Sequence, residues 1–345
     1  MRRPTALAAA LTLLTVGAAQ ASGVKAIKDW SAVCDNLNTC VAFAWPRDEA
    51  EIAWLRLERK GDAGAPVTAV LAVYAEDDLN VGGGPWLLDV DGKPVPGLAA
   101  LFPTQDGNGY WRMEIPAANM RALVIAARDG SVLKLTRRGR DPLTLSLSGG
   151  AATMIWIDEQ QGRIGLPTAL GRATGRSRAI AIRARPVIKS GPEQPQTGLP
   201  KAMPASVLKA IGDCEDLAET ASSAVIARLS PGVVLYAPVC SRGAYNAVFS
   251  LVLADETGRG ARRILLPLPQ GYEQASISDP MNIDYDPTTR VMTSFSKGRG
   301  LGDCGDETQW VWDGTAFRVS YALLMSECRG VSVDDWPQLF RAEVR

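Results

Sequence analysis

The sequence predicts an α+β protein that is mainly antiparallel β, with two β-rich domains, a few short helices and local disulfides. Three observations support this class. Short runs of alternating polar and apolar residues recur along the 345 residues and are separated by Gly, Pro and Asp turn signals. A proline-rich stretch, 186–206, divides the chain. Six cysteines form three pairs of near neighbours in the sequence.

Residues 1–21 have the pattern of a secretory signal peptide. Two arginines precede an uncharged apolar segment, 6–19, and small residues surround a predicted cut after Ala21. The apolar segment is shorter than the roughly 20 residues that a membrane-spanning helix needs, so an uncleaved anchor is the less favoured alternative. We therefore expect a periplasmic or secreted protein with no transmembrane segment after cleavage.

The segment 22–185 is expected to form the N-terminal β-rich domain. Residues 51–59 alternate in polarity and residues 67–74 are rich in β-branched side chains, which predicts a hairpin about the turn 61–66. Further strands are predicted at 86–90, 110–115, 131–136 and 143–147.

Two helices are predicted within the same segment. Pro116 suits the first turn of a helix over 116–124. A second helix is expected at 151–161, opened by Ser148 and closed by Gly162, because glycine tolerates the left-handed conformation at a helix end.

The stretch 186–206 contains five prolines and is expected to be an extended linker. The segment 207–345 then forms a C-terminal antiparallel β domain, which a helix at 205–211 introduces. The turn signals lie at 255–258, 286–289 and Asp313-Gly314. The predicted strands are 233–238, 247–253, 263–266, 282–285, 290–295, 309–312 and 317–324.

The cysteine spacing favours three local disulfides, one in the first domain and two in the second. The expected pairs are Cys34–Cys40, Cys214–Cys240 and Cys304–Cys328. The residues between the first pair are turn formers, which predicts a hairpin tip pinned by a bridge. A redox-active pair is disfavoured because no C-x-x-C motif is present. Crossed pairings stay open, since six cysteines allow many connectivities.

Composition and charge restrict the function. The chain has no histidine, which excludes Ser-His-Asp and Cys-His catalysis and the commonest metal ligand, so we expect no metal and no cofactor. Signal cleavage leaves 35 basic and 37 acidic residues, a net charge of −2, which gives nucleic-acid binding no electrostatic basis. A basic cluster is interpreted as a solvated face, with an anionic partner as the alternative; it comprises Arg172, Arg176, Arg178, Arg183 and Arg185.

The densest polar group in a predicted element surrounds the end of the helix at 151–161. Asp158, Gln161 and Arg163 are candidate ligand contacts, although a helix end capped by Gly162 with Arg163 paired to a carboxylate or carbonyl explains the same residues. Asp158 and its neighbour Glu159 cannot face one substrate together, because adjacent helix residues point in different directions.

Two tryptophans and a glycine-rich loop are further candidates. Trp310 and Trp312 share one face of a predicted strand and form either core packing or a stacking platform for a sugar or a partner. The loop 298–307 lacks a phosphate-binding motif. Its carboxylates offer calcium a minor alternative site; they are Asp303, Asp306 and Glu307.

Three segments together resemble an uncharacterised family of bacterial extracytoplasmic proteins, the domain of unknown function DUF1176. The first is KDWSAVCDN at 28–36, followed by Cys40. The second is LSLSGGAA at 145–152, which leads into WIDEQQGRIG at 156–165. The third comprises GDCG at 302–305, WVWDG at 310–314, Phe317 and CRG at 328–330. The resemblance implies an envelope or periplasmic protein whose cysteines are structural bridges, and it implies no reaction.

These observations favour a non-enzymatic binding or interaction protein of the bacterial envelope, with an unknown envelope component or protein as its partner. The alternative is a carboxylate-dependent envelope hydrolase. Such an enzyme needs two or more acids that converge in a concave pocket. The acids considered are Asp158, Glu159, Asp303, Asp306 and Glu307.

Overall fold

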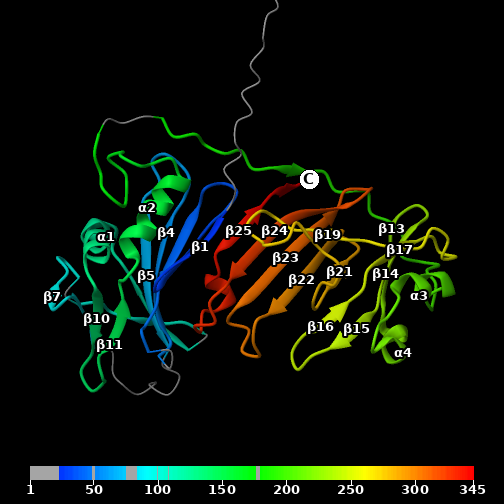
Figure 1. Ribbon diagram of the computed structural model, residues 1–345, viewed down its shortest axis with the longest axis horizontal. Coiled ribbons are helices and arrows are strands. Elements are labelled where there is room, and N and C mark those ends of the chain that lie inside the picture. The colour runs from blue at the N-terminus through cyan, green and yellow to red at the C-terminus, as the bar shows by residue number, and fades with distance from the viewer. Residues whose placement is uncertain (1–22, 49–50, 75–83, 99, 108, 176–178) are drawn as a thin grey trace, which may run out of the picture.

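A computed structural model describes residues 23–48, 51–74, 84–98, 100–107, 109–175 and 179–345. The predicted signal peptide, and Arg176 and Arg178 of the basic cluster, lie outside these ranges. Figure 1 shows an elongated molecule with the blue-to-green N-terminal half on one side, an orange and red sheet in the middle, and yellow-green strands with two short helices on the far side.

A seven-stranded antiparallel sheet forms the centre of the N-terminal half. Its order is β1-β2-β3-β4-β5-β9-β8, so the first five strands follow one another along the chain. Every residue of β2 and β3 is buried, which shows that both faces of the sheet are covered there. The bounds are β1 Gly23–Ile27, β2 Trp30–Cys34, β3 Cys40–Ala44, β4 Ala53–Arg59, β5 Val67–Tyr74, β9 Tyr110–Glu114 and β8 Thr104–Gln105.

Helices and a second sheet cover one face of this sheet. They share a core that includes Trp30, Leu55 and Leu71 from the sheet and Leu123 and Met154 from the helices. The elements are β6 Leu87–Val90, β7 Lys93–Pro94, the 3-10 turn η1 Ala117–Asn119, α1 Met120–Asp129, β10 Val132–Thr136, β11 Leu143–Ser146 and α2 Gly150–Gln160. The four strands pair in the order β11-β10-β6-β7.

The opposite face packs against a five-stranded sheet from the C-terminal half. Phe43 and Trp54 of the first sheet belong to one apolar cluster with Leu323 and Trp336 of the C-terminal half. The five strands pair in sequence order, and their bounds are β21 Asp284–Asp286, β22 Val291–Lys297, β23 Gly305–Trp312, β24 Phe317–Met325 and β25 Gln338–Arg341. A 3-10 turn, η3 Val333–Asp335, precedes β25. The two halves therefore share part of their core.

The remaining C-terminal elements lie at the far end of the molecule (Figure 1). Helices α3 Ala205–Ile211 and α4 Leu217–Thr220 pack on the sheet β13-β14-β17-β18 through Val207 and Tyr236. The other bounds are η2 Ala221–Ser223, β13 Val225–Ser230, β14 Val233–Ala237, β17 Val252–Ala254 and β18 Arg262–Arg263. Two hairpins complete this part: β15 Val239–Arg242 with β16 Ala247–Phe249, and β19 Leu266–Pro267 with β20 Ser276–Ile277.

The proline-rich stretch is extended and attached to the C-terminal half. Its strand β12, Val187–Ile188, pairs in parallel with β26, Glu343–Val344, near the chain end marked C in Figure 1. The Gly191 N–H also donates to the Trp312 carbonyl at 2.8 Å. The stretch therefore runs along the protein, and the division into domains 22–185 and 207–345 stays a prediction.

The predicted fold class is confirmed in its coarser form, because the protein is mainly antiparallel β with few helices. Strand 67–74 and helix 205–211 have the predicted bounds. The helix expected at 116–124 is a 3-10 turn followed by α1, which continues to Asp129 because Val124 and Ala127 still face the core. Among the described residues, no helix is long and apolar enough to cross a membrane.

One predicted helix start is wrong. The residue that precedes α2 is Gly149, with φ 103° and no side-chain cap, and not Ser148. A β-carbon at 149 would lie 2.1 Å from the Ile27 carbonyl oxygen, so only glycine fits this approach of the chain to the end of β1. Ser148 instead accepts a hydrogen bond from the Asp29 N–H through its own carbonyl.

The three disulfides join the cysteines that are near neighbours in the sequence: Cys34–Cys40, Cys214–Cys240 and Cys304–Cys328. None of them crosses the stretch 186–206. Three disulfides are consistent with an extracytoplasmic protein.

Candidate functional site

The loop closed by Cys34–Cys40 lies where the two large sheets meet. Asp35 is fully buried in this loop, and its Oδ1 accepts the backbone N–H groups of Leu37 and Thr39 at 2.8 and 2.7 Å. Its Oδ2 lies 2.9 Å from Nη2 of Arg341, the last residue of β25. Burial raises the pKa of Asp35, and the Arg341 charge opposes that rise. The buried carboxylate therefore organises the loop and holds the edge strand of the other sheet.

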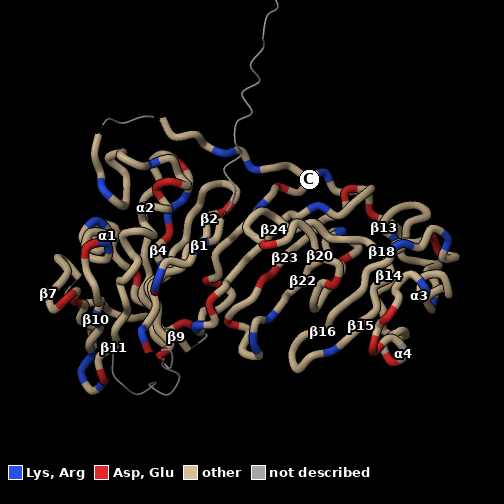
Figure 2. The backbone as a smooth tube through the Cα atoms, viewed as in Figure 1, with Lys and Arg blue, Asp and Glu red and all other residues tan. Residues whose placement is uncertain are grey.

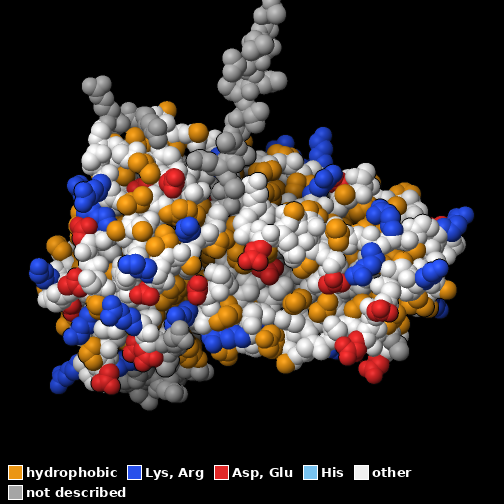
Figure 3. All heavy atoms as spheres, in the orientation of Figure 1, with side chains coloured by type: hydrophobic (Ala, Val, Ile, Leu, Met, Phe, Trp, Pro, Cys, Tyr) orange, Lys and Arg blue, Asp and Glu red, His pale blue; other side chains and the backbone are white. Residues whose placement is uncertain are grey.

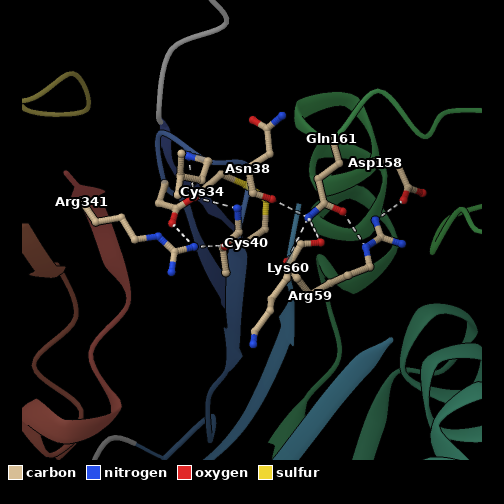
Figure 4. Close-up of a disulfide and its surroundings, with 11 residues drawn as sticks. Cys34, Asn38, Cys40, Arg59, Lys60, Asp158, Gln161 and Arg341 are labelled. Carbon is tan, nitrogen blue, oxygen red and sulfur yellow. Dashed lines mark hydrogen bonds and ion pairs between the residues drawn. A yellow bond between two sulfur atoms is a disulfide. The ribbon is translucent and has the colours of Figure 1, made fainter. Parts of the chain in front are cut away.

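Further hydrogen bonds attach the same loop to β25. The Asn36 side-chain amide donates to the Arg341 carbonyl and accepts the Arg341 N–H, both at 3.0 Å. Arg341 also donates to the Thr39 hydroxyl at 2.6 Å. Figure 4 shows Arg341 reaching the loop from the C-terminal sheet, on the side opposite to α2.

On the α2 side, the loop is held by Gln161. Its amide nitrogen donates to the carbonyls of Asn38 at 2.7 Å and Arg59 at 2.9 Å, and its Oε1 accepts from Arg59 at 2.5 Å. Arg59 also pairs with Asp158 at 2.7 Å, with both side chains 2% exposed. Burial lowers the pKa of Arg59 to about 10, against the effect of Asp158. The loop therefore connects α2, β4 and β25.

The candidate ligand contacts Asp158, Gln161 and Arg163 are all buried and bound to protein groups. Asp158 accepts the N–H groups of Leu170 and Gly171 as well as Arg59. Arg163 donates to two backbone carbonyls and to the Thr168 hydroxyl, and Gly162 has φ 64°. This arrangement matches the alternative interpretation of the sequence, a helix end capped by Gly162 with Arg163 bound to carbonyl groups. Ligand binding by these three residues stays an untested prediction.

Trp310 and Trp312 lie in the core of the C-terminal half. They are 1% and 2% exposed, and their indole N–H groups donate to the Pro267 carbonyl and the Ser230 hydroxyl. Both rings therefore have the packing role that was one of the two predicted alternatives, whereas a stacking platform needs an exposed ring face.

The five carboxylates considered for a hydrolase are spread over the molecule. Asp158 and Glu159 both belong to α2, where Asp158 is buried and Glu159 is exposed. Asp303 is bound by Arg299 and by the Gly330 N–H. Burial raises the pKa of Asp306 to about 6, and Asp306 and Glu307 alternate along β23 and so point to opposite faces. Among the described residues, no group of three or more such side chains has the arrangement of a metal site.

A polar cleft of about 550 Å³ lies between the two large sheets, beside the disulfide loop. Val41, Leu323 and Trp336 supply apolar lining, and the charged lining residues carry both signs. The cations are Arg56, Lys60 and Arg341, and the anions are Glu58, Glu307 and Asp334. Figure 2 shows residues of both signs along both halves of the chain, and Figure 3 shows no large patch of one charge on the face in view. Of the five carboxylates considered above, Glu307 alone lines the cleft.

Some of the polar side chains that line the cleft are paired with one another. Arg56 pairs with Glu58 at 2.7 Å, and Gln309 donates to Glu307 at 2.9 Å. In the described part of the chain, the Lys60 ammonium and the Tyr321 hydroxyl have no protein partner, and neither does the Gln338 amide. Figure 4 shows the Lys60 side chain turned away from the buried network. The cleft therefore presents one cation, one hydroxyl and one amide that are available to a ligand.

Sequence reasoning did not single out this cleft. One signal was present, because Arg56, Glu58 and Lys60 recur every second residue along β4 and its end and so share a face. Arg341 carried no such signal, since its partners Asp35 and Asn36 lie in a loop about 300 residues away in the sequence.

Residues 24–343 match the family model described as protein of unknown function (DUF1176). The chain belongs to the DUF1176 family. This confirms the predicted resemblance, and the DUF1176 match runs through both large sheets and the stretch between them. A curated relative, the uncharacterized protein YpfG of Escherichia coli (strain K12), is 28% identical over 337 residues, which cover 92% of each chain.

A solved structure, that of invasion associated protein B from Bartonella henselae, is also similar to part of this DUF1176 chain. The sequences are 19% identical, and the match covers 41% of this chain and 99% of that chain with a TM-score of 0.28. This similarity is too low to support an argument about function.

Proposed function

We propose that this protein is exported to the bacterial envelope and binds a polar envelope component in the cleft between the two large sheets, without chemical turnover. The observation that carries the proposal is a set of cleft side chains that have no partner among the described residues, Lys60, Tyr321 and Gln338. The cleft volume of about 550 Å³ falls within the range of small-molecule sites.

The charges of the cleft indicate the kind of ligand. Three cations and three anions line the cleft, so its net charge is close to zero and does not attract a ligand of high net charge. An overall neutral molecule with many hydrogen-bonding groups fits better, because it can use the free lysine, hydroxyl and amide. The apolar lining residues Leu323 and Trp336 offer contact area to its less polar faces.

Fragment binding by NMR tests the proposal. Soluble saccharide and peptide fragments released from purified envelope are mixed with the mature protein, and saturation transfer to bound fragments is recorded. We expect a bound fragment whose affinity falls about thirtyfold in a Lys60→Gln, Gln338→Ala variant, because each of the two lost ligand hydrogen bonds contributes about 1 kcal/mol. The control is Lys93→Gln, which changes an exposed lysine of β7 outside the cleft.

Two results contradict the proposal. Binding that is equal in the cleft variant and in the control places the ligand elsewhere. Conversion of a bound fragment into new products favours the hydrolase alternative, with Glu307 as the first acid to replace by Gln. Export is tested separately, since mass measurement of the mature protein is expected to place its first residue at Ser22.

A further inference from the structure

We propose that a second cavity, of about 420 Å³, binds the carboxylate of a small molecule. It lies at the turn between β1 and β2 and is lined there by Lys28, and by Arg47 after β3. It shares no lining residue with the cleft between the sheets. The inference therefore does not depend on the proposed function.

The cavity brings together the three segments that carried the family resemblance. Lys28, Asp29 and Trp30 belong to the first segment, Ser148 to the second and Arg329 to the third. The Asp29 N–H donates to the Ser148 carbonyl at 3.2 Å, which fixes the first two segments to each other. The walls of the cavity are therefore held in place by the fold.

The charges of the cavity favour a monoanion. Lys28, Arg47 and Arg329 face two acids, Asp29 and Glu327, which leaves one excess positive charge. Asp29 already accepts the Ser146 hydroxyl at 2.5 Å. Lys28 and Arg47 are exposed and bind no other protein group among the described residues. A single carboxylate matches this excess, whereas a dianionic phosphate would be repelled by the two acids.

Two buried tryptophans line the cavity, so their indole signals can report whether it is occupied. Trp30 and Trp45 line the cavity and are 1% and 3% exposed, and neither indole nitrogen has a hydrogen-bond partner within the part of the chain that the structure describes. Of the five described tryptophans with such a nitrogen, these two line one cavity. A β-carbon at Gly150 would lie within 3.3 Å of the Trp30 ring, so the close packing of α2 holds this indole in place.

Proton NMR of the indole groups tests the site. The Trp30 and Trp45 Hε1 signals are assigned with the variants Trp30→Phe and Trp45→Phe, and sodium acetate replaces sodium chloride at constant ionic strength. We expect both signals to shift with saturation, and the affinity to fall about tenfold in a Lys28→Gln, Arg47→Gln variant. Lys25→Gln is the matched control, because Lys25 is an exposed lysine of β1 that does not line the cavity.

Several results would overturn the proposed site or its assignment to a carboxylate. No shift, a shift that never saturates, or equal affinity in the double variant overturns the site. Tighter binding of phosphate than of acetate overturns the assignment to a carboxylate. The cleft variant Lys60→Gln is expected to leave the acetate response unchanged, so failure of the cleft proposal does not affect this test. If the double variant does not fold, the single variants Lys28→Gln and Arg47→Gln are each expected to weaken binding.

Discussion

The guanidinium of Arg341 lies 2.9 Å from the fully buried carboxylate of Asp35, and this pair joins the edge strand of the C-terminal sheet to the disulfide loop of the N-terminal sheet. Among the described residues, Asp35 has no other cationic partner. Removal of the arginine leaves a buried charge unpaired, which costs more than the pair itself contributes.

We therefore expect Arg341→Met to lower the free energy of unfolding by about 3 kcal/mol. Urea denaturation followed by tryptophan fluorescence measures the change. The control is Arg345→Met, because Arg345 is exposed and pairs with the exposed Glu343, and its loss is expected to change stability by less than about 0.5 kcal/mol. Equal effects of the two substitutions would show that the Asp35 contact does not hold the sheets together.

The Cys34–Cys40 bridge is expected to contribute more than its loop length predicts. Chain entropy alone gives about 2 kcal/mol for a loop of this size and about 3.5 kcal/mol for the loop closed by Cys214–Cys240. The short loop, however, also orients Asp35, Asn36 and Asn38, which bind β25 and Gln161.

The expected result is that Cys34→Ser, Cys40→Ser destabilises the protein at least as much as Cys214→Ser, Cys240→Ser. Thermal unfolding of both double variants under non-reducing conditions measures this order. If the variant of the short loop loses less stability than the variant of the long loop, the short loop does not have the proposed role of orienting Asp35, Asn36 and Asn38.

The buried pair Arg59–Asp158 is a second place where one lost partner is costly. We expect Asp158→Ala to lower the free energy of unfolding by about 3 to 5 kcal/mol, because Arg59 and two backbone N–H groups lose their acceptor. Glu159→Ala is the control, since this neighbour is exposed. Urea denaturation of both variants is the measurement, and a stable Asp158→Ala protein that has lost ligand binding would instead favour the ligand-contact prediction.

Asp306 is expected to make stability depend on pH. Burial raises its pKa from 3.8 to about 6. A carboxyl group with a raised pKa binds its proton more tightly in the folded state, so its contribution is present at low pH and is lost as the pH rises from about 4 to about 6.

The variant Asp306→Asn removes this titration. At pH 7 we expect it to be more stable than the wild type by about 1 to 2 kcal/mol, and the difference should vanish near pH 4. Thermal unfolding across this pH range is the measurement. Asp284→Asn is the control, because Asp284 is exposed on β21. A difference that does not vary with pH would assign the effect to packing and not to charge.

Local patterns in the sequence were sufficient to locate several strands and helices. Polarity alternates along β4, and the predicted and observed bounds of β5 and α3 coincide. The three disulfides are the local pairs that the spacing favoured, although spacing alone left crossed pairings open. The strands β2 and β3 lacked this signal, since they are buried on both faces and so show no alternation.

The candidate cleft and the roles of the polar residues depended on contacts between distant segments. Asp158 and Gln161 had the composition of a surface site, yet they are buried because Arg59 and the loop after Cys34 pack against the end of α2. By itself, the sequence determined the β-rich class, the local strand and helix periods and the disulfide spacing, because these depend on neighbouring residues. Only the tertiary structure decided which faces are covered and which polar groups stay free, because sheet-on-sheet packing joins residues such as Asp35 and Arg341 that no local pattern relates.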